Sequence, residues 1–182
     1  MNYIALSDTH GAHRQITIPE GIDIIIHAGD ACEDGDENQL KDFFSWFSSL
    51  PVRYKIFVPG NHDLPFELEP EEAKMLVPNN VILLENSGVI IEGIHFYSLP
   101  VRPWLFSPLP IPEDVDVLIT HGPPYGILDE NIGCRILREL VEIAKPKVHL
   151  FGHIHSQGGK SIKVGSTMFY NISEVSLKLD LI

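Results

Sequence analysis

The sequence predicts an α/β fold in which mixed β-sheets lie between helices, and two observations predict it. Short apolar runs typical of buried strands alternate with segments of helical spacing near both ends of the chain. Between these two β-α-β regions, three strand-like runs follow one another with only short turns between them. Because 182 residues suffice for one hydrophobic core, we expect a single domain over residues 1–182.

Three buried strands are predicted in the first third of the chain. Each is an apolar run that ends at a polar residue or a glycine, and the runs are NYIALS (2–7), DIIIHAG (23–29) and YKIFVPG (54–60). Between the second and third runs, the apolar residues from Leu40 to Phe47 follow helical spacing, and Pro51 ends this helix. A shorter helix is expected over 69–77, because acidic residues occupy its first turn.

The rest of the chain predicts a β-meander, a second β-α-β unit and a closing hairpin. Asn, Ser and Gly turns separate the three strands of the meander, which are expected over 80–86, 88–93 and 94–99. The β-α-β unit and the hairpin follow as strand 114–120, helix 133–144, strand 147–153 and hairpin 166–182.

Composition and charge exclude several classes of protein. The formal net charge of −12 argues against nonspecific binding to the nucleic-acid backbone, which requires clustered Lys and Arg. The first residues resemble no signal peptide, and no apolar run approaches the length of a membrane span. Two cysteines, Cys32 and Cys134, do not form a disulfide framework, so we expect a cytoplasmic protein with no membrane partner. Oligomeric state is not predicted.

Metal-ligand side chains follow five of the predicted strands. His153 and His155 are two positions apart, so in an extended chain both imidazoles face the same side. Ligand sites in open α/β folds lie at the carboxyl ends of the strands. The residues found there, in chain order, are Asp8, His10, Asp30, Asn61, His62, Asp63, His121, His153 and His155. Together they predict a metal site at the strand ends.

These motifs, D-x-H, G-D, G-N-H-D, H and G-H-x-H, resemble in their order the calcineurin-like metallophosphoesterase family. The match runs from Asp8 to His155 and lacks no ligand position. The resemblance implies a four-layer sandwich, with two mixed β-sheets flanked by helices and a two-metal site. Carried over by position, one metal takes Asp8, His10, Asp30 and His155; the second takes Asp30, Asn61, His121 and His153. Asp30 bridges the two.

Ligand chemistry agrees with that assignment. Mixed carboxylate, amide and imidazole ligands suit Mn, Fe or Zn better than Ca or Mg, and manganese is the expected ion. No cysteine occupies a ligand position, which excludes a thiolate zinc site. Two ions roughly 4 Å apart clamp a phosphate and activate a bridging hydroxide for in-line attack. The resemblance thus implies a metal-dependent phosphoric ester hydrolase without a covalent intermediate.

His62 is the histidine of the third motif that the family pattern leaves outside the metal ligands. The resemblance places it beside the leaving-group oxygen, as a general acid or as a donor to the phosphate. A carboxylate is needed to orient it, and Asp63, Asp34 and Glu33 remain alternatives; Asp63 is grouped with His62 as catalytic. Substrate contacts are expected from Asn61, His62, His153 and Arg102.

The motif "GDACEDG" argues against a Ser/Thr protein phosphatase. Asp34 stands where the related Ser/Thr protein phosphatases have an arginine that holds a phosphomonoester dianion, and an acid would repel that dianion. Together with "THGPP", the motifs look like the small metallophosphoesterase-domain branch related to animal brain and adult-tissue proteins. That branch implies hydrolysis of phosphodiesters, cyclic nucleotides among them, so the partner is a small phosphoester or nucleotide.

Two alternative functions stay open at this point. A phosphomonoesterase or nucleotide pyrophosphohydrolase would use the same metals, whereas a noncatalytic scaffold would not need the complete ligand set found here. The Pro-rich segment 98–112 also allows two interpretations. It is either a substrate wall, with Trp104 or Phe106 stacking on a base, or a crossover packed on the core. His13 is open to either role as well, while His27, His95, His149 and Cys32 are expected to be structural.

Overall fold

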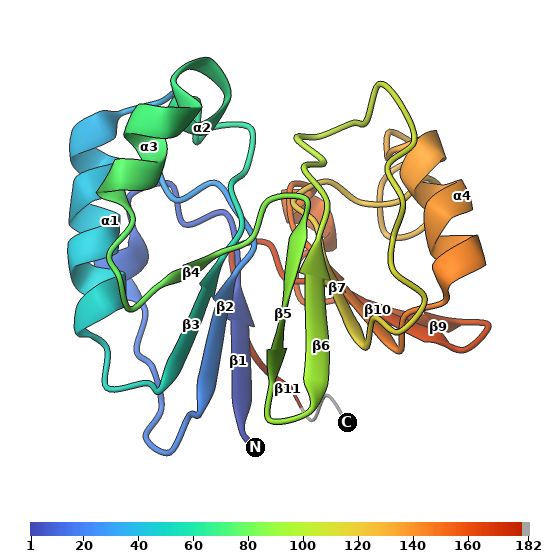
Figure 1. The fold of residues 1–182 in the computed structure, drawn as a ribbon, viewed down its shortest axis with the longest axis horizontal. Helices are drawn as coiled ribbons and strands as arrows, with labels where there is room; N and C mark the ends of the chain where they lie inside the picture. Colours follow the sequence, from blue (N-terminus) through green and yellow to red (C-terminus); the bar gives the residue numbers. More distant parts are fainter. Residues whose placement is uncertain (180–182) are drawn as a thin grey trace.

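The computed structural model describes residues 1–179 and has four layers. Two β-sheets pack face to face in the middle, helices α1, α2 and α3 cover the outer face of one sheet, and α4 covers the other (Figure 1). The four-layer sandwich of two mixed sheets and flanking helices that the sequence predicted is therefore confirmed.

The first sheet has five strands in the order β11-β1-β2-β3-β4. Its strands are β1 (Tyr3–Leu6), β2 (Ile24–His27), β3 (Tyr54–Phe57), β4 (Ile82–Leu83) and β11 (Ser176–Leu179). Strands β1 to β4 run parallel, and β11 is antiparallel to β1. Because β1 to β3 are parallel, their carboxyl ends lie at one edge of the sheet.

The second sheet has six strands in the order β5-β6-β7-β8-β10-β9. They are β5 (Ser87–Ile91), β6 (Ile94–Ser98), β7 (Val117–Ile119), β8 (Val148–Phe151), β9 (Ser161–Val164) and β10 (Thr167–Asn171). The four inner strands are parallel, and antiparallel β5 and β9 form the edges. Strand β9 is exposed along its length and was not predicted from the sequence.

The helices begin and end where side-chain chemistry dictates. In α1 (Glu37–Ser49), the Asp36 carboxylate accepts hydrogen bonds from the first-turn amides, and the face from Leu40 to Phe47 is buried. In α4 (Arg135–Ala144), the N-cap is Cys134, and Lys145 ends the helix in a left-handed conformation. The remaining helices are α2 (Pro65–Leu68), α3 (Pro70–Leu76) and the 3₁₀ turns η1 (His13–Gln15) and η2 (His155–Gln157).

The apolar core has three parts, one at each interface between layers. Ile26, Ile56 and Leu150 are among the fully buried residues between the two sheets. Phe43, Phe44, Phe47, Phe57 and Phe66 pack between the first sheet and its helices, and the second sheet packs on α4 through residues such as Leu137. Fully burying one such side chain stabilises the fold by roughly 1.5–3 kcal/mol. The continuous core fixes the two sheets, and hence their strand ends, against each other.

Two expectations about strand pairing were wrong. The predicted meander over 80–99 is split, because β4 joins the first sheet while β5 and β6 form a hairpin in the second. The predicted closing hairpin over 166–182 does not form among the described residues, and 180–182 lie outside them. Strand β10 pairs with β8 and β9, which occupy both of its edges, so β11 pairs instead with the open edge of β1.

The segment 98–112 is a crossover packed on the core. Leu99, Val101 and Leu105 are buried against α4 and the second sheet. The Trp104 indole nitrogen donates a hydrogen bond to the Ile132 carbonyl (2.9 Å), while Phe106 is 97% exposed. This agrees with the crossover interpretation; no base-stacking role follows from these contacts.

None of the described helices is both long and apolar enough to span a bilayer.

His149 gives the fold a pH dependence that can be tested. Burial lowers its pKa to about 3, and its Nε2 pairs with the Thr120 hydroxyl at 2.9 Å. Below about pH 6.5 the unfolded chain therefore binds a proton at this residue, whereas the folded chain does not. The free energy of unfolding then falls by about 1.4 kcal/mol per pH unit as the pH decreases. His149→Gln has no imidazole to protonate, so this loss disappears in the variant. We expect the unfolding free energy of wild type minus that of the variant to be about 2 kcal/mol smaller at pH 5 than at pH 7.

Urea unfolding with a chelator present, which keeps metal binding constant, measures this difference. Parallel curves for the two proteins between pH 7 and 5 would mean that His149 does not stay neutral in the folded state.

Candidate metal centre

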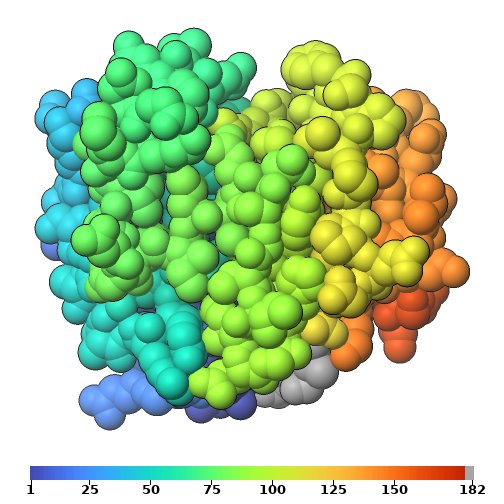
Figure 2. Space-filling model, in the orientation of Figure 1, coloured from blue at the N-terminus to red at the C-terminus, as the bar shows by residue number. Residues whose placement is uncertain are grey.

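The predicted ligands come together where the strands of both sheets end. Asp8 and His10 follow β1, Asp30 follows β2, and Asn61 follows β3. The second sheet contributes His121 after β7, and His153 and His155 after β8. In the space-filling view, the upper edge of the molecule is indented between α2 and the 98–112 crossover (Figure 2).

Six of the seven predicted ligands form two groups, each with ligand atoms within 4.8 Å of one another. One group is Asp8, His10 and His155; the other is Asp30, His121 and His153. Asp30 Oδ2 lies between them, 3.1 Å from His121 Nε2 and 3.9 Å from His10 Nε2. This is the arrangement expected if Asp30 bridges two ions.

Some atoms of the predicted ligands are buried without hydrogen-bond partners. Among the described residues these are Asn61 Oδ1 and His10 Nε2. A buried polar atom without a partner costs roughly 1–3 kcal/mol, so native structures rarely leave several together. A pair of divalent ions bound by these donors would remove the cost, and the residues present therefore fit the dimetal centre.

Contacts behind the histidines fix which ring nitrogen faces the centre. His121 Nδ1 lies 2.9 Å from the Ala28 carbonyl, and His155 Nδ1 lies 3.2 Å from Glu174. In each ring Nε2 is then free to act as a ligand, which is how metal-binding histidines are usually held. Sequence reasoning missed Glu174, because it lies far along the chain from His155 in no recognisable motif.

Four of the predicted ligand residues have a strained backbone conformation. Asp8, His10, Asp30 and His153 adopt φ values of 57°, 42°, 58° and 70°. Non-glycine residues are uncommon in this left-handed region, where each costs of order 1–3 kcal/mol. Four such residues at one site indicate that the surrounding hydrogen bonds hold them there for function.

Two glycines allow the loops to approach one another closely. A Cβ atom on Gly60 would collide with the Asp30 carboxylate, and one on Gly152 would collide with Ser7 and the Asp8 carboxylate. The glycines of the G-N-H-D and G-H-x-H motifs thus allow the loops after β3 and β8 to pack closely against the loops after β2 and β1.

The charges of the centre favour a bound cation. Burial alone would raise the pKa of Asp8, but hydrogen bonds from His155 and the charge of His121 hold it well below its usual range. Burial alone would lower the pKa of His121, but Asp30 and Asp8 raise it to about 9. Because these buried carboxylates stay ionised and stabilise positive charge between them, the same position suits a divalent ion.

His62 lies beside the ligand groups, with its ring centroid 5.0 Å from that of His10. Its Nδ1 is 3.1 Å from Asp34 Oδ1 and 3.5 Å from Glu33 Oε2. Glu33 also lies 3.4 Å from His10 Nδ1. Of the three carboxylates that the sequence left open, the structure therefore places Glu33 and Asp34, and not Asp63, against His62.

Asp63 does not have the catalytic placement that was expected. Its side chain is fully buried and accepts hydrogen bonds from the backbone amides of Asp30, Ala31, Cys32 and Gly60. Burial and the neighbouring Asp30 raise its pKa to about 6. Its role is to tie the loop after β3 to the loop after β2, and this keeps Asp30 in place.

Arg102 also differs from the expectation that it contacts substrate. Its side chain is largely buried, and one terminal nitrogen of its guanidinium is ion-paired with Glu85. His13 is buried against Phe43 and Trp46, with Nε2 3.0 Å from Asp42, which settles its role as structural. The structural roles expected for His27, His149 and Cys32 agree with their complete burial.

Comparison with protein families gives a match over residues 1–157 to the calcineurin-like phosphoesterase family. The chain belongs to this family. It is 35% identical over 214 aligned residues to human metallophosphoesterase domain-containing protein 1, which covers 94% of this chain and 65% of the human protein. This chain therefore spans slightly less than two thirds of the length of that relative.

Solved structures share the metallophosphoesterase fold at low identity. Phosphopantetheinyl hydrolase from Mycobacterium tuberculosis has a TM-score of 0.68 at 15% identity, over 96% of this chain and 89% of that one. A structure described as a novel archaeal phosphodiesterase has a TM-score of 0.55 at 19% identity, over 96% of this chain and 84% of that one. At such identities the likeness supports the fold alone.

Removing the metals is expected to lower stability as well as activity. Ions that bind only the folded state stabilise it by about 2.7 kcal/mol per site at a concentration of one hundred times Kd. Dialysis against a chelator should therefore lower the melting temperature by several degrees, and added Mn²⁺ should restore it. Calorimetric melting of chelated, reloaded and mock-treated protein measures the effect. Identical melting curves would contradict a metal centre in the folded chain.

Proposed function

We propose that this metallophosphoesterase is a manganese-dependent phosphodiesterase that acts on a small phosphoester or nucleotide. The observation that carries the proposal is the pair of His and Asp groups, one of which contains Asp30 with its Oδ2 3.9 Å from His10 Nε2 of the other, and His62 beside them. When bound, the two ions supply Lewis acidity toward the phosphate and lower the pKa of an attacking water. Asp8, His10, Asp30 and His155 would hold one ion, and Asp30, Asn61, His121 and His153 the other.

The protein's own side chains bind and orient the substrate and transfer a proton to it. Glu33 and Asp34 hold His62 by its Nδ1, which leaves Nε2 to donate to the phosphate or to the leaving oxygen. Asn61 and His153, which follow strands that end at the centre, would contact the phosphate. No protein nucleophile is required, so ester cleavage takes one displacement.

Charge near His62 favours a diester over a monoester. Glu33 and Asp34 stand within 3.5 Å of its ring, and the nearby candidate cation, Arg102, is already paired with Glu85. A phosphomonoester dianion carries one more negative charge than a diester and would be repelled more strongly by these carboxylates. A diester has the lower charge.

Turnover of bis-p-nitrophenyl phosphate and p-nitrophenyl phosphate, with Mn²⁺ added to metal-free protein, tests the proposal. We expect kcat/KM for the diester to exceed that for the monoester at least tenfold. The reverse order would make the protein a phosphomonoesterase. Loaded protein that turns over neither ester, with Mn²⁺, Fe²⁺ or Zn²⁺, would be a noncatalytic scaffold. Asp30→Asn prepared in parallel controls for contaminating phosphatases.

A further inference from the structure

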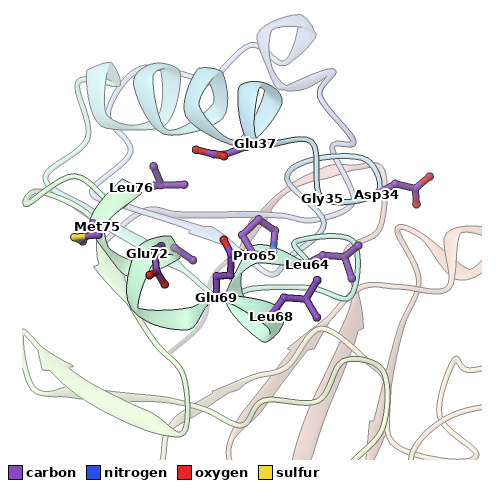
Figure 3. Close-up of a pocket in the computed structure, with 11 residues that line it drawn as sticks. Asp34, Gly35, Glu37, Leu64, Pro65, Leu68, Glu69, Glu72, Met75 and Leu76 are labelled. Atoms are coloured by element: carbon purple, nitrogen blue, oxygen red, sulfur yellow. The ribbon is translucent and has the colours of Figure 1, made fainter.

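A groove of about 520 Å³ lies beside the chain segments that flank His62. It runs between the N-terminal end of α1 and helices α2 and α3 (Figure 3). Its volume lies within the range of sites that bind small organic groups. The residues that line it are Asp34, Gly35, Glu37, Leu64, Pro65, Leu68, Glu69, Glu72, Ala73, Met75 and Leu76.

The groove continues directly from the chain segment that carries His62. Asp34 lies at one end of the groove, and its Oδ1 is 3.1 Å from His62 Nδ1. The Gly35 amide donates to the His62 carbonyl (2.9 Å), and Leu64 follows His62 by two residues. The groove therefore begins beside the segment that holds His62, next to the Nδ1 side of its ring.

Most of its lining residues are apolar, and two of them are unusually exposed. Leu68 is 72% exposed and Met75 is 78% exposed, although both are large hydrophobic side chains. Pro65 and Leu76 point into the space between the helices (Figure 3). An apolar ligand body that covers these side chains would remove their surface from water, at roughly 25 cal/mol per Å².

The charged groups of the groove are all acidic. Among the described residues that line it, none is basic. Glu37 is ion-paired with Lys41 at 2.5 Å, whereas no ion pair is found for Glu69 or Glu72 within the described part of the chain. Figure 3 shows both of these glutamates on the α2–α3 wall, beside the apolar side chains. Two unpaired carboxylates next to an apolar surface complement a cation carried on an apolar body.

We propose that this groove binds the leaving group of the substrate, and that this group is an apolar body that bears a positive charge. The inference rests on the proposed function, because it assigns the leaving alcohol to the side of His62. The substrate class is then a phosphodiester of an amine- or quaternary-ammonium-containing alcohol. Its apolar part contacts Leu64, Pro65 and Leu68, and its cation lies near Glu69 and Glu72.

A pair of isosteric esters tests the charge preference. They are the methyl phosphodiesters of 4-(trimethylammoniomethyl)phenol and of its uncharged isostere, 4-neopentylphenol, with phenol release followed by chromatography. The ratio of their kcat/KM values is compared between wild type and variants, so intrinsic differences in leaving-group reactivity cancel. In Glu69→Gln/Glu72→Gln we expect the ratio of cationic to neutral ester to fall about three- to tenfold, the sum of two exposed charge contacts.

Glu71→Gln is the matched control. Glu71 lies on the same helix with the same charge, but it pairs with Lys74 and does not line the groove. An unchanged ratio in the double variant would overturn the proposal. An equal fall in Glu71→Gln would overturn it too, because the preference would then come from the general negative field. The wild-type ratio should also decrease as salt is added.

Binding without turnover separates this proposal from the proposed function. Met75 lines the groove and is one of three methionines, so its ¹³C-labelled methyl signal, assigned with Met75→Leu, reports on occupancy. We expect benzyltrimethylammonium to shift this signal in wild type and to shift it several-fold less in Glu69→Gln/Glu72→Gln. If the cation binds but neither ester is cleaved, the proposed function fails, the leaving-group assignment fails with it, and the groove stands only as a site for an apolar cation.

If the esters are cleaved but the Met75 signal does not respond, the groove assignment fails and the proposed function stands. A response to a lysine-rich peptide but not to benzyltrimethylammonium would overturn the assignment as well, and would make the groove a peptide site.

Discussion

Asp30→Asn is expected to abolish nearly all phosphoester turnover and to release at least one metal ion per chain. Asp30 Oδ2 lies 3.1 Å from His121 Nε2 and 3.9 Å from His10 Nε2, so this carboxylate connects the two ligand groups. An amide has the same shape but supplies neither the negative charge nor a second anionic oxygen. Metal content by elemental analysis and initial rates with bis-p-nitrophenyl phosphate measure the two effects.

Asp114→Asn is the control for the loss of one carboxylate. Asp114 is exposed, pairs with His95 and lies on the segment before β7, away from the ligand groups. This variant should keep both metals and normal rates. If Asp30→Asn also keeps both metals and normal rates, Asp30 does not bridge the ions.

His62→Ala is expected to lower kcat by about 10²–10⁴ for a diester with a poor leaving group, while both metals stay bound. The reason is that His62 is held by Glu33 and Asp34 beside the ligand groups, where it donates a proton to the departing oxygen. p-Nitrophenolate leaves without needing a proton, so the loss with bis-p-nitrophenyl phosphate should be much smaller. Rates for alkyl and p-nitrophenyl diesters, with metal analysis of the same samples, provide the comparison.

His95→Ala is the matched control, because His95 lies in β6 and pairs with Asp114 rather than with residues of the centre. It should leave both rates and the metal content unchanged. Equal losses on both esters in His62→Ala would make stabilisation of the phosphate the main role of His62. Loss of metal in that variant would place His62 among the ligands.

The positions of the ligands follow from the sequence because strand ends are easy to recognise and parallel strands share an edge. Asp8, Asp30, His121 and His153 each come within a few residues of the end of an apolar run, and the chain must turn there. Once β1, β2 and β3 are parallel, as are β7 and β8, their following loops meet at one end of the molecule. Local pattern and topology therefore suffice to gather these side chains.

Pairing between strands was not determined by the same patterns. An apolar alternation shows that a segment is a strand, but it does not show which sheet receives it. Strands β4 and β11 join the first sheet because the edges of β3 and β1 are open there, whereas β10 already has partners on both sides. These choices depend on contacts between residues more than twenty positions apart.

The roles of the acidic residues near His62 were likewise decided only by the tertiary structure. Glu33, Asp34 and Asp63 have similar sequence contexts, each close to a motif residue. Asp63 turns inward to accept four backbone amides, while Glu33 and Asp34 turn toward His62. The direction of a side chain in a loop is set by the hydrogen bonds that satisfy buried amides, and those donors come from a different part of the chain. The sequence by itself determined which residues meet at the strand ends, and the packing of the loops determined which of them face the centre.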